Sequence, residues 1–146
     1  TLSTENKEEA AFAVKYLQNL QYNLSMNGIL PQEYTVGIIS PYRAQVELLR
    51  ELWTNEEDKI KISTIDGFQG QERDLIIISL VRSNPKSEIG FLSDYPRLNV
   101  ALTRARKKLV VIGDSSTIGN DKFYNQFIQF TQDNNFYHSV FEFWEM

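Results

Sequence analysis

Positive charge gathers in one short stretch of the sequence. Residues 97–108 contain no aspartate or glutamate, and they carry the basic residues Arg97, Arg104, Arg106, Lys107 and Lys108. Arginine and lysine side chains bind phosphate groups, so this stretch is a candidate for local contact with a polyanion such as nucleic acid. The alternative is a helix that presents a charged face to solvent, and charge alone favours that alternative.

The side chains that most enzymes use for catalysis are scarce. No Gly-x-x-x-x-Gly-Lys-Ser/Thr occurs, and none of the seven glycines is followed by lysine, so the chain cannot build its own phosphate-binding loop. It has no GxGxxG for a dinucleotide either. The single histidine, His138, lies in an aromatic tail and is typical of a packing or surface residue. Without cysteine, and with Glu56, Glu57 and Asp58 interpreted as a solvated loop, we predict no metal site.

The length and composition indicate one globular domain. The chain has 146 residues and a mass of 17.0 kDa, with 42% hydrophobic and 23% charged residues. A net charge of -4 and a pI near 5.0 exclude a generally basic surface. The longest apolar run is too short to cross a membrane, and the N-terminus has no signal-peptide pattern. We therefore expect a cytoplasmic setting, and we interpret Thr1 as a domain boundary.

Helical and strand patterns alternate along the chain. Apolar residues recur at helical spacing over residues 8–24, 42–53, 96–106 and 121–131, with Ser3 or Thr4 as the predicted N-cap of the first helix and Asn27-Gly28 as its end. Short runs rich in Ile and Val predict strands over residues 35–40, 59–65, 75–81 and 109–113. This alternation predicts an α/β fold in which helices cover both faces of a parallel sheet.

Polar segments follow three of the predicted strands. They occupy residues 40–43, 66–73 and 113–116. Ligands of doubly wound sheets bind outside the carboxyl ends of the strands. We therefore predict that these segments meet at one edge of the sheet and form the functional site there.

Three segments then stand out by their order along the chain. They are VGIISPYRAQV at residues 36–46, ISTIDGFQGQERD at 62–74 and RLNVALTRAR at 97–106. They resemble motifs IV, V and VI of the second RecA-like domain of superfamily 1B helicases, the branch that contains the nonsense-mediated-decay RNA helicase and the replication helicase-nuclease. The resemblance extends over residues 8–130. It implies a RecA-like fold of the P-loop NTPase type without its own phosphate loop, and it makes residues 1–146 a single C-terminal motor domain from a larger chain.

The resemblance implies a shared site for ATP with Mg²⁺. In this family the nucleotide binds between two RecA-like domains, and the N-terminal one supplies the phosphate loop and the magnesium ligands. This chain would supply arginines. Arg104 matches the arginine finger of motif VI, and Arg43 matches an arginine of motif IV that contacts the γ-phosphate; the alternative for both is a surface cation. Some relatives carry the second arginine directly after the motif IV glutamine, where this chain has Val46.

Other residues match the family's contacts with the rest of the nucleotide. Tyr42 matches a tyrosine that stacks on adenine. Glu72, with Gln69 and Gly70 in the same turn, matches residues that meet the ribose or help to place the finger. A polar turn capped by glycine is the alternative for these three. Arg97 matches the family pattern as well, and it fits the nucleotide cleft and a salt bridge within the domain equally.

The resemblance also implies a track for single-stranded DNA or RNA. Ser63 and Thr64 match motif V hydroxyls that contact the backbone of the strand, and Ser40 holds a similar place after the first strand. Such contacts go mainly to phosphates. The alternative is a buried hydroxyl that satisfies its own backbone.

The sequence therefore predicts the C-terminal motor domain of an ATP-dependent helicase, inactive as an isolated domain. Two alternatives stay open. One is a non-catalytic RecA-like module that binds nucleic acid or a protein, and the other is a domain that completes an ATP site on a separate chain.

Overall fold

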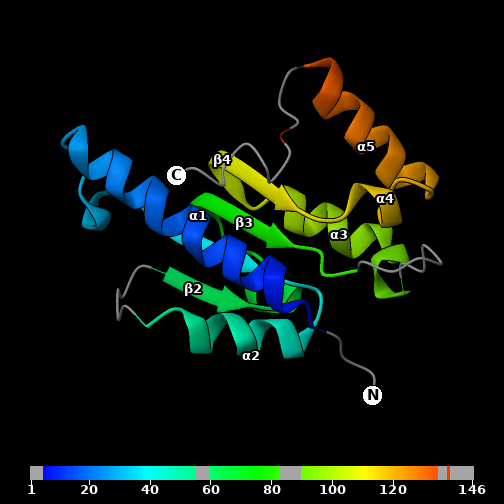
Figure 1. Cartoon of the computed structure of the whole chain (residues 1–146), viewed down its shortest axis with the longest axis horizontal. Coiled ribbons are helices and arrows are strands. Elements are labelled where there is room, and N and C mark those ends of the chain that lie inside the picture. The colour runs from blue at the N-terminus through cyan, green and yellow to red at the C-terminus, as the bar shows by residue number, and fades with distance from the viewer. Residues whose placement is uncertain (1–4, 55–59, 83–89, 135–137, 139–146) are drawn as a thin grey trace.

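The computed structural model describes residues 5–54, 60–82, 90–134 and 138. Its centre is a parallel sheet with the strand order β2-β1-β3-β4 (Figure 1). The strands are β1 (Val36–Ile39), β2 (Ile60–Ser63), β3 (Arg73–Ser79) and β4 (Ala105–Ile112). Helices cover both faces of this sheet, so the predicted α/β fold of RecA-like type is confirmed.

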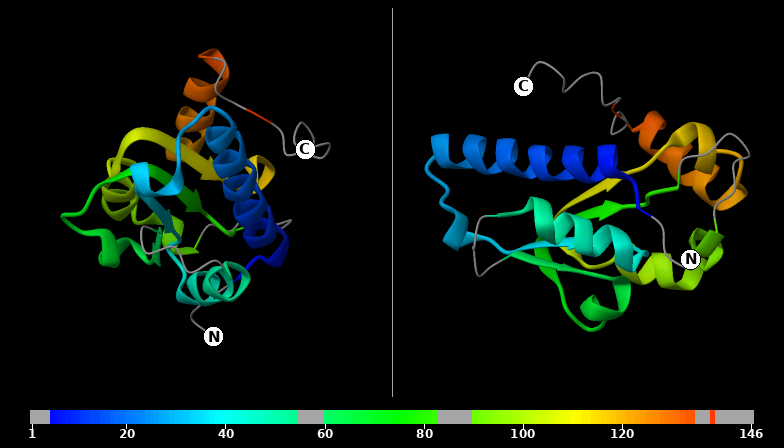
Figure 2. Two further views of the ribbon diagram at one scale, coloured as in Figure 1. Left: turned by 90° about the vertical axis from the view of Figure 1, so that its left-hand side faces the viewer. Right: turned by 60° about the horizontal axis from the view of Figure 1, so that its bottom comes forward.

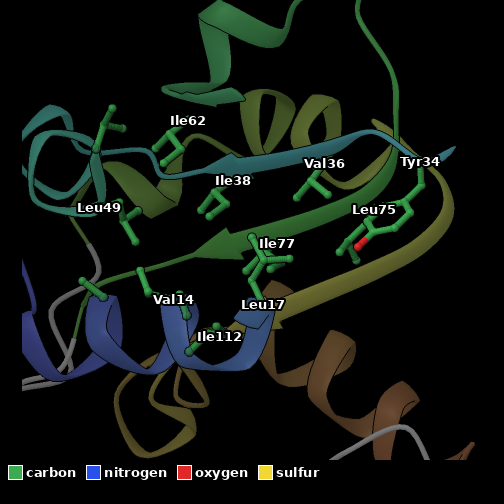
Figure 3. Close-up of a cluster of buried hydrophobic side chains, with 13 residues drawn as sticks. Val14, Leu17, Tyr34, Val36, Ile38, Leu49, Ile62, Leu75, Ile77 and Ile112 are labelled. Atoms are coloured by element: carbon green, nitrogen blue, oxygen red, sulfur yellow. The ribbon is translucent and has the colours of Figure 1, made fainter. Parts of the chain in front are cut away.

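Two helices cover one face of the sheet. α1 (Lys7–Met26) and α2 (Arg43–Leu52) pack side by side on it (Figure 2). Strand side chains that point to this face, such as Val36, Ile38 and Ile77, lie against Val14, Leu17 and Leu49 of the helices (Figure 3). Their neighbours along the strands, among them Ile39, Ile76 and Ile78, belong to the core on the opposite face. This alternation places both faces of the sheet in the core, as the continuous Ile and Val runs predict.

The opposite face is covered by three α-helices and two 3₁₀ turns among the described residues. They are η2 (Ile65–Phe68), η3 (Gly90–Ser93), α3 (Tyr95–Leu102), α4 (Ser115–Ile118) and α5 (Lys122–Asp133). A further 3₁₀ turn, η1 (Pro31–Glu33), precedes β1. α5 begins beside α4 and points away from the sheet (Figure 1). The predicted helices over residues 96–106 and 121–131 correspond to α3 and α5.

The connection from β2 to β3 crosses the sheet face without an α-helix. It passes over β1 through η2, whose Phe68 is fully buried against the strand. Gly37 of β1 makes this close packing feasible, because a Cβ atom there would lie 2.6 Å from Phe68 Cε1 and 2.8 Å from Ile76 Cδ1. All carboxyl ends of these parallel strands lie on one side of the sheet, which we name the carboxyl edge, and all amino ends lie on the opposite side, the amino edge. The glycine thus allows the chain to return from the carboxyl edge to the amino edge within a few residues.

The largest difference from the prediction concerns residues 96–113. The predicted helix to residue 106 ends at Leu102, and the predicted strand from residue 109 begins at Ala105. Arg106, Lys107 and Lys108 therefore lie on an edge strand, where exposed charged side chains are tolerated, and not on a solvated helix face. Ala105 continues the helical spacing of apolar residues beyond Leu102, and the basic residues that follow fit either element, so the sequence pattern does not mark this boundary.

Smaller differences affect the ends of other elements. The N-cap of α1 is Asn6, whose side chain accepts a hydrogen bond from the Glu9 N–H; Ser3 and Thr4 lie outside the described residues. The predicted end at Asn27-Gly28 is confirmed, with Gly28 in the left-handed region at φ 83°. β2 ends at Ser63, because Ile65 already begins η2. The loop predicted at Glu56, Glu57 and Asp58 lies outside the described residues.

Candidate functional site

The residues predicted for the site lie on two opposite edges of the sheet. The carboxyl edge holds Ser40, Tyr42, Arg43, Ser63 and Thr64. The amino edge holds Gln69, Gly70, Glu72 and Arg104, which precede β3 and β4. The prediction that residues 66–73 gather at the carboxyl edge is therefore wrong for the second half of that segment. The physical reason is the η2 crossover, which carries the chain to the other edge before β3 begins.

Arg104 is fixed at the start of β4. Its backbone carbonyl accepts a hydrogen bond from the Arg73 N–H at 3.0 Å. Its guanidinium folds back onto the end of α3, where Nε donates to the Val100 carbonyl at 3.1 Å and Nη2 donates to the Thr103 hydroxyl at 3.1 Å. No carboxylate among the described residues pairs with it. Arg104 is therefore a held cation whose charge is not neutralised within the described part of the chain.

The turn before β3 lies directly beside Arg104, because Arg73 follows it. Gly70 adopts the left-handed conformation at φ 72°, which favours glycine. Two cations hold the turn: Lys61 Nζ donates to the Gly67 carbonyl and to Gln71 Oε1, and Arg73 donates to Gln71 Oε1 and to the Glu72 carbonyl. The Glu72 side chain is exposed, and its carboxylate has no hydrogen bond within the described ranges. Gln69 is also exposed.

Arg97 forms a salt bridge within the domain. Its Nη2 lies 3.0 Å from Asp66 Oδ2 of η2, and both side chains are largely exposed. The structure therefore contains the second of the two roles predicted for Arg97. Exposed pairs of this kind contribute about 0–1 kcal/mol to stability, so this one can open at little cost.

Ser40 and Tyr42 are buried. The Ser40 hydroxyl accepts a hydrogen bond from the Tyr42 N–H at 3.3 Å, which is the alternative predicted for a hydroxyl at a strand end. The Tyr42 side chain is 3% exposed and lies in the core beside Ile39 and Ile78. In this arrangement its ring offers no face to a ligand, so adenine could stack on it only after the ring had left the core.

Arg43, Ser63 and Thr64 are accessible at the carboxyl edge. Arg43 is the exposed first residue of α2, and its guanidinium forms no hydrogen bond or ion pair with any described residue. Ser63 and Thr64 are half-buried. The Thr64 side chain does not cap η2, which leaves its hydroxyl available at the turn.

A buried polar network joins α1, α2 and β3 at this edge. Glu9 is 8% exposed, and its Oε1 accepts hydrogen bonds from the Ser79 hydroxyl at 2.6 Å and from the Val81 N–H at 2.8 Å. Gln45 Nε2 donates to Ser79 Oγ and to the Asn6 carbonyl, and Gln45 Oε1 accepts from the Asn6 N–H. Val81 is held at φ 75°, an uncommon conformation for a β-branched residue.

Sequence reasoning missed Glu9 and Asn6 as members of this network. Glu9 is one of two acidic residues in the first turn of α1, a position that is normally favoured by the helix dipole and exposed. The sequence offers one signal for the burial of Glu9. Glu9 directly precedes Ala10, which lies on the buried side of α1. Gln45 lies in a segment that the prediction singled out, but only for Tyr42 and Arg43.

The ionised form of Glu9 is disfavoured in the folded state. Burial raises the pKa of its carboxyl above the usual 4.5, and the hydrogen bonds from Ser79 and Val81 offset only part of that effect. The pKa is therefore higher in the folded chain than in the unfolded chain. The protonated Glu9 carboxyl therefore contributes to the free energy of unfolding. This contribution is fully present below about pH 4.5, and it is lost as the pH rises through the pKa that Glu9 has in the folded chain.

We expect Glu9→Gln to remove this pH dependence. Glutamine keeps the acceptor for Ser79 and Val81 without a buried charge, so the variant should gain free energy of unfolding relative to the wild type as the pH rises from about 4.5. Glu9→Ala should instead lose about 1–3 kcal/mol at about pH 4.5 and below, because it leaves buried donors without an acceptor. Since alanine does not titrate either, this deficit relative to the wild type should shrink as the pH rises. Denaturant unfolding across a pH series measures both. A constant difference between Glu9→Gln and the wild type would contradict the expectation.

Two general features complete the description. Among the described residues no group of three or more His, Cys, Asp or Glu side chains could hold a metal ion. The described helices include none that is long and apolar enough to cross a membrane.

Comparison with known proteins agrees with this architecture. A family of AAA domains matches residues 1–116. The chain is 44% identical to DNA polymerase alpha-associated DNA helicase A of Saccharomyces cerevisiae over 138 aligned residues. This alignment covers 90% of this chain and 19% of that protein. It is 43% identical to Helicase sen1 of Schizosaccharomyces pombe (88% of this chain, 8% of that protein) and 40% identical to DNA-binding protein SMUBP-2 of Rattus norvegicus (74% and 11%).

The chain thus spans less than a fifth of the length of each of these relatives. The match covers the three segments and the strands that carry them, and the relatives are helicases and a DNA-binding protein. The chain belongs to the AAA-domain family that forms the C-terminal RecA-like region of superfamily 1 helicases.

Proposed function

We propose that this chain is the C-terminal motor domain of an ATP-dependent helicase, in which it supplies an arginine finger and part of the track for a single strand. The observation that carries the proposal is Arg104: a guanidinium fixed by the end of α3, without a carboxylate partner among the described residues, beside the turn that contains Glu72. A fixed, uncompensated cation is suited to stabilise charge that develops on transferring phosphoryl oxygens.

The amino edge fits one half of a site for ATP with Mg²⁺. Arg104 would contact the phosphoryl oxygens as the bond to the leaving group breaks. Glu72, free of partners in its described surroundings, would accept hydrogen bonds from the ribose hydroxyls, and Gly70 lets the backbone with Gln69 approach closely. Arg97 would turn from Asp66 toward the nucleotide at little cost. The phosphate loop and the magnesium ligands would come from an N-terminal RecA-like domain of the same parent chain.

The carboxyl edge supports contacts with a single strand of DNA or RNA. Ser63 and Thr64 are accessible there and would bind backbone phosphates. The contact of Arg43 with the γ-phosphate stays a prediction, because Arg43 lies at the edge opposite Arg104. Ser40 is buried, so we propose that it holds the start of α2 through the Tyr42 N–H. An overall charge of -4 permits such a track, because only local contacts are required.

The two alternatives differ in their need for Arg104. A module that only binds nucleic acid or a protein gains nothing from a cation held in this way. A domain that completes an ATP site on a separate chain would use the same residues, with the phosphate loop on its partner. The arrangement of Arg104 and Glu72 at one edge favours catalysis over binding alone.

The test is an assay of the full-length protein that contains this chain. We expect ATP hydrolysis that single-stranded DNA or RNA stimulates, and strand displacement that requires ATP. A non-hydrolysable ATP analogue is the control and should support binding without displacement. Binding of single strands without any hydrolysis would favour the non-catalytic module, and hydrolysis that appears only with a second protein would favour the shared site between chains.

A further inference from the structure

The ladder between β3 and β4 contains an irregularity next to Arg104. Arg73 pairs with Ala105, but the next pair recorded along the ladder joins Leu75 to Lys108. One residue of β3, Asp74, therefore stands opposite two residues of β4, Arg106 and Lys107, which is the arrangement of a β-bulge. Bulges are rare between parallel strands, and they redirect side chains near functional sites.

A set of hydrogen bonds holds this bulge. Asp74 uses both carboxylate oxygens: Oδ1 accepts from Arg106 Nε at 3.2 Å, and Oδ2 accepts from the Thr35 N–H at 2.9 Å. The Thr35 hydroxyl closes the ring, because it accepts from the Asp74 N–H at 3.0 Å and from Arg106 Nη2 at 3.2 Å. These three residues, which we name the clasp, tie the amino ends of β1, β3 and β4 together.

The clasp is better shielded than the salt bridge between Arg97 and Asp66. The Asp74 side chain is 17% exposed, whereas Asp66 in the pair with Arg97 is 75% exposed. Charge-assisted hydrogen bonds that are partly shielded from water hold their geometry more firmly than exposed ones. The hydrogen bond from the Thr35 N–H lowers the pKa of Asp74, burial raises it, and the charge of Arg106 lowers it again. The net effect holds this pKa below its usual value, so the carboxylate stays ionised at neutral pH.

The position of Arg104 depends on this geometry. Only Ala105 separates Arg104 from Arg106, and the Arg104 carbonyl is itself bonded to the N–H of Arg73, next to Asp74. If the bulge slipped, β4 would shift in register by one residue, and the start of β4 with Arg104 would be carried away from the turn before β3. The placement of Arg104 beside that turn thus depends on how the bulge is held, while Val100 and Thr103 orient its guanidinium.

We propose that Asp74, with Thr35 and Arg106, is a positioning residue for the phosphoryl-transfer reaction, which acts by holding the β4 bulge and thereby the arginine finger. This inference rests on the proposed function of Arg104. None of the three touches the nucleotide in this proposal. Their effect is on the placement of Arg104 alone.

Asp74→Asn in the full-length protein is the informative variant. Asparagine has one acceptor oxygen in place of two, so an N–H of its amide must face either the Thr35 N–H or Arg106 Nε. We expect kcat for ATP hydrolysis to fall about tenfold to a hundredfold, the size of effect produced by a misplacement of about 1 Å. KM for ATP and the affinity for single strands should change less than about twofold, because the variant leaves intact the contacts that are equally strong in the ground state and the transition state.

Conservative replacements and a matched control separate positioning from general destabilisation. Thr35→Ser keeps the hydroxyl and should retain kcat, whereas Thr35→Val removes it and should lower kcat as Asp74→Asn does. Val14→Ala destabilises the core on the α1 face without touching the clasp and should leave kcat unchanged at temperatures where the protein is folded. A transition-state mimic, ADP with aluminium fluoride, should bind more weakly to Asp74→Asn, while ADP alone binds equally.

The outcomes distinguish this inference from the proposed function. If Arg104→Ala abolishes hydrolysis but Asp74→Asn keeps the wild-type kcat, the positioning role is wrong and the finger stands. If Arg104→Ala hydrolyses ATP normally, the finger itself is wrong, whatever Asp74 does. If Asp74→Asn lowers single-strand affinity and ADP affinity together with kcat, the clasp is merely structural and the inference is overturned.

Discussion

Arg104→Ala is expected to lower the rate of ATP hydrolysis by the full-length protein about 10³- to 10⁵-fold, the loss typical of arginine fingers. The reason is that the guanidinium is held at one place before the reaction, so it stabilises the transition state without reorganisation. Affinity for single-stranded nucleic acid should persist, because Ser63 and Thr64 lie at the opposite edge of the sheet.

Lys108→Ala is the matched control for this experiment. Lys108 is an exposed cation on the same strand, and its loss changes the net charge by the same amount without reaching the amino-edge turn. Its hydrolysis rate should stay near that of the wild type. Steady-state hydrolysis and single-strand binding of both variants measure the difference. Near-normal hydrolysis by Arg104→Ala would show that another residue stabilises the phosphoryl group.

The second large effect concerns this chain by itself. At saturating ATP and single-stranded nucleic acid, we expect a turnover far below about 1 per second, the lower end typical of enzymes. No glycine of the sequence is followed by lysine, so the chain cannot form a phosphate loop, and Arg104 has no bound phosphate to act on. Hydrolysis assays on the purified chain test this directly.

A domain that carries a phosphate loop provides the complementary measurement. Added as a separate chain, it should raise turnover only if the two surfaces meet without a covalent link, and Arg104→Ala in this chain should then remove the gain. Turnover above about 1 per second by this chain alone would contradict the expectation and the assignment of half a site.

The fold could be predicted from the sequence because its strongest signals are local. Runs such as residues 75–81, short and rich in isoleucine, are typical of strands that are buried on both faces of a parallel sheet. The boundary near residue 104 could not be predicted, since Arg106, Lys107 and Lys108 fit a solvated helix and an edge strand equally well. The pairing of these residues with β3 decides between the two. Asp74 of β3, which accepts a hydrogen bond from Arg106, lies 32 positions earlier in the chain.

The sequence indicates candidate residues for the site but not their arrangement. The motif segments single out Arg104 and Glu72 as candidates, yet nothing in their spacing indicates that η2 returns the chain to the amino edge. That return depends on the contact between Gly37 and Phe68, two residues in different elements. The clasp and the network of Glu9 are equally non-local, because Thr35 and Asp74 are 39 positions apart and Glu9 and Val81 are 72 apart.

The same long separations determine how the chain can fold. The three ladders among the described residues are all parallel, so none of these three can begin as a hairpin, and each requires the closure of a long loop at an entropic cost. α1 can form its own turns early. The Glu9 carboxylate, however, can accept the hydrogen bonds from Ser79 and Val81 only after those residues have been synthesised. We therefore expect the apolar side of α1 to be covered only in part, by β1 and α2, until β3 has been synthesised, and a folding rate typical of proteins with high contact order.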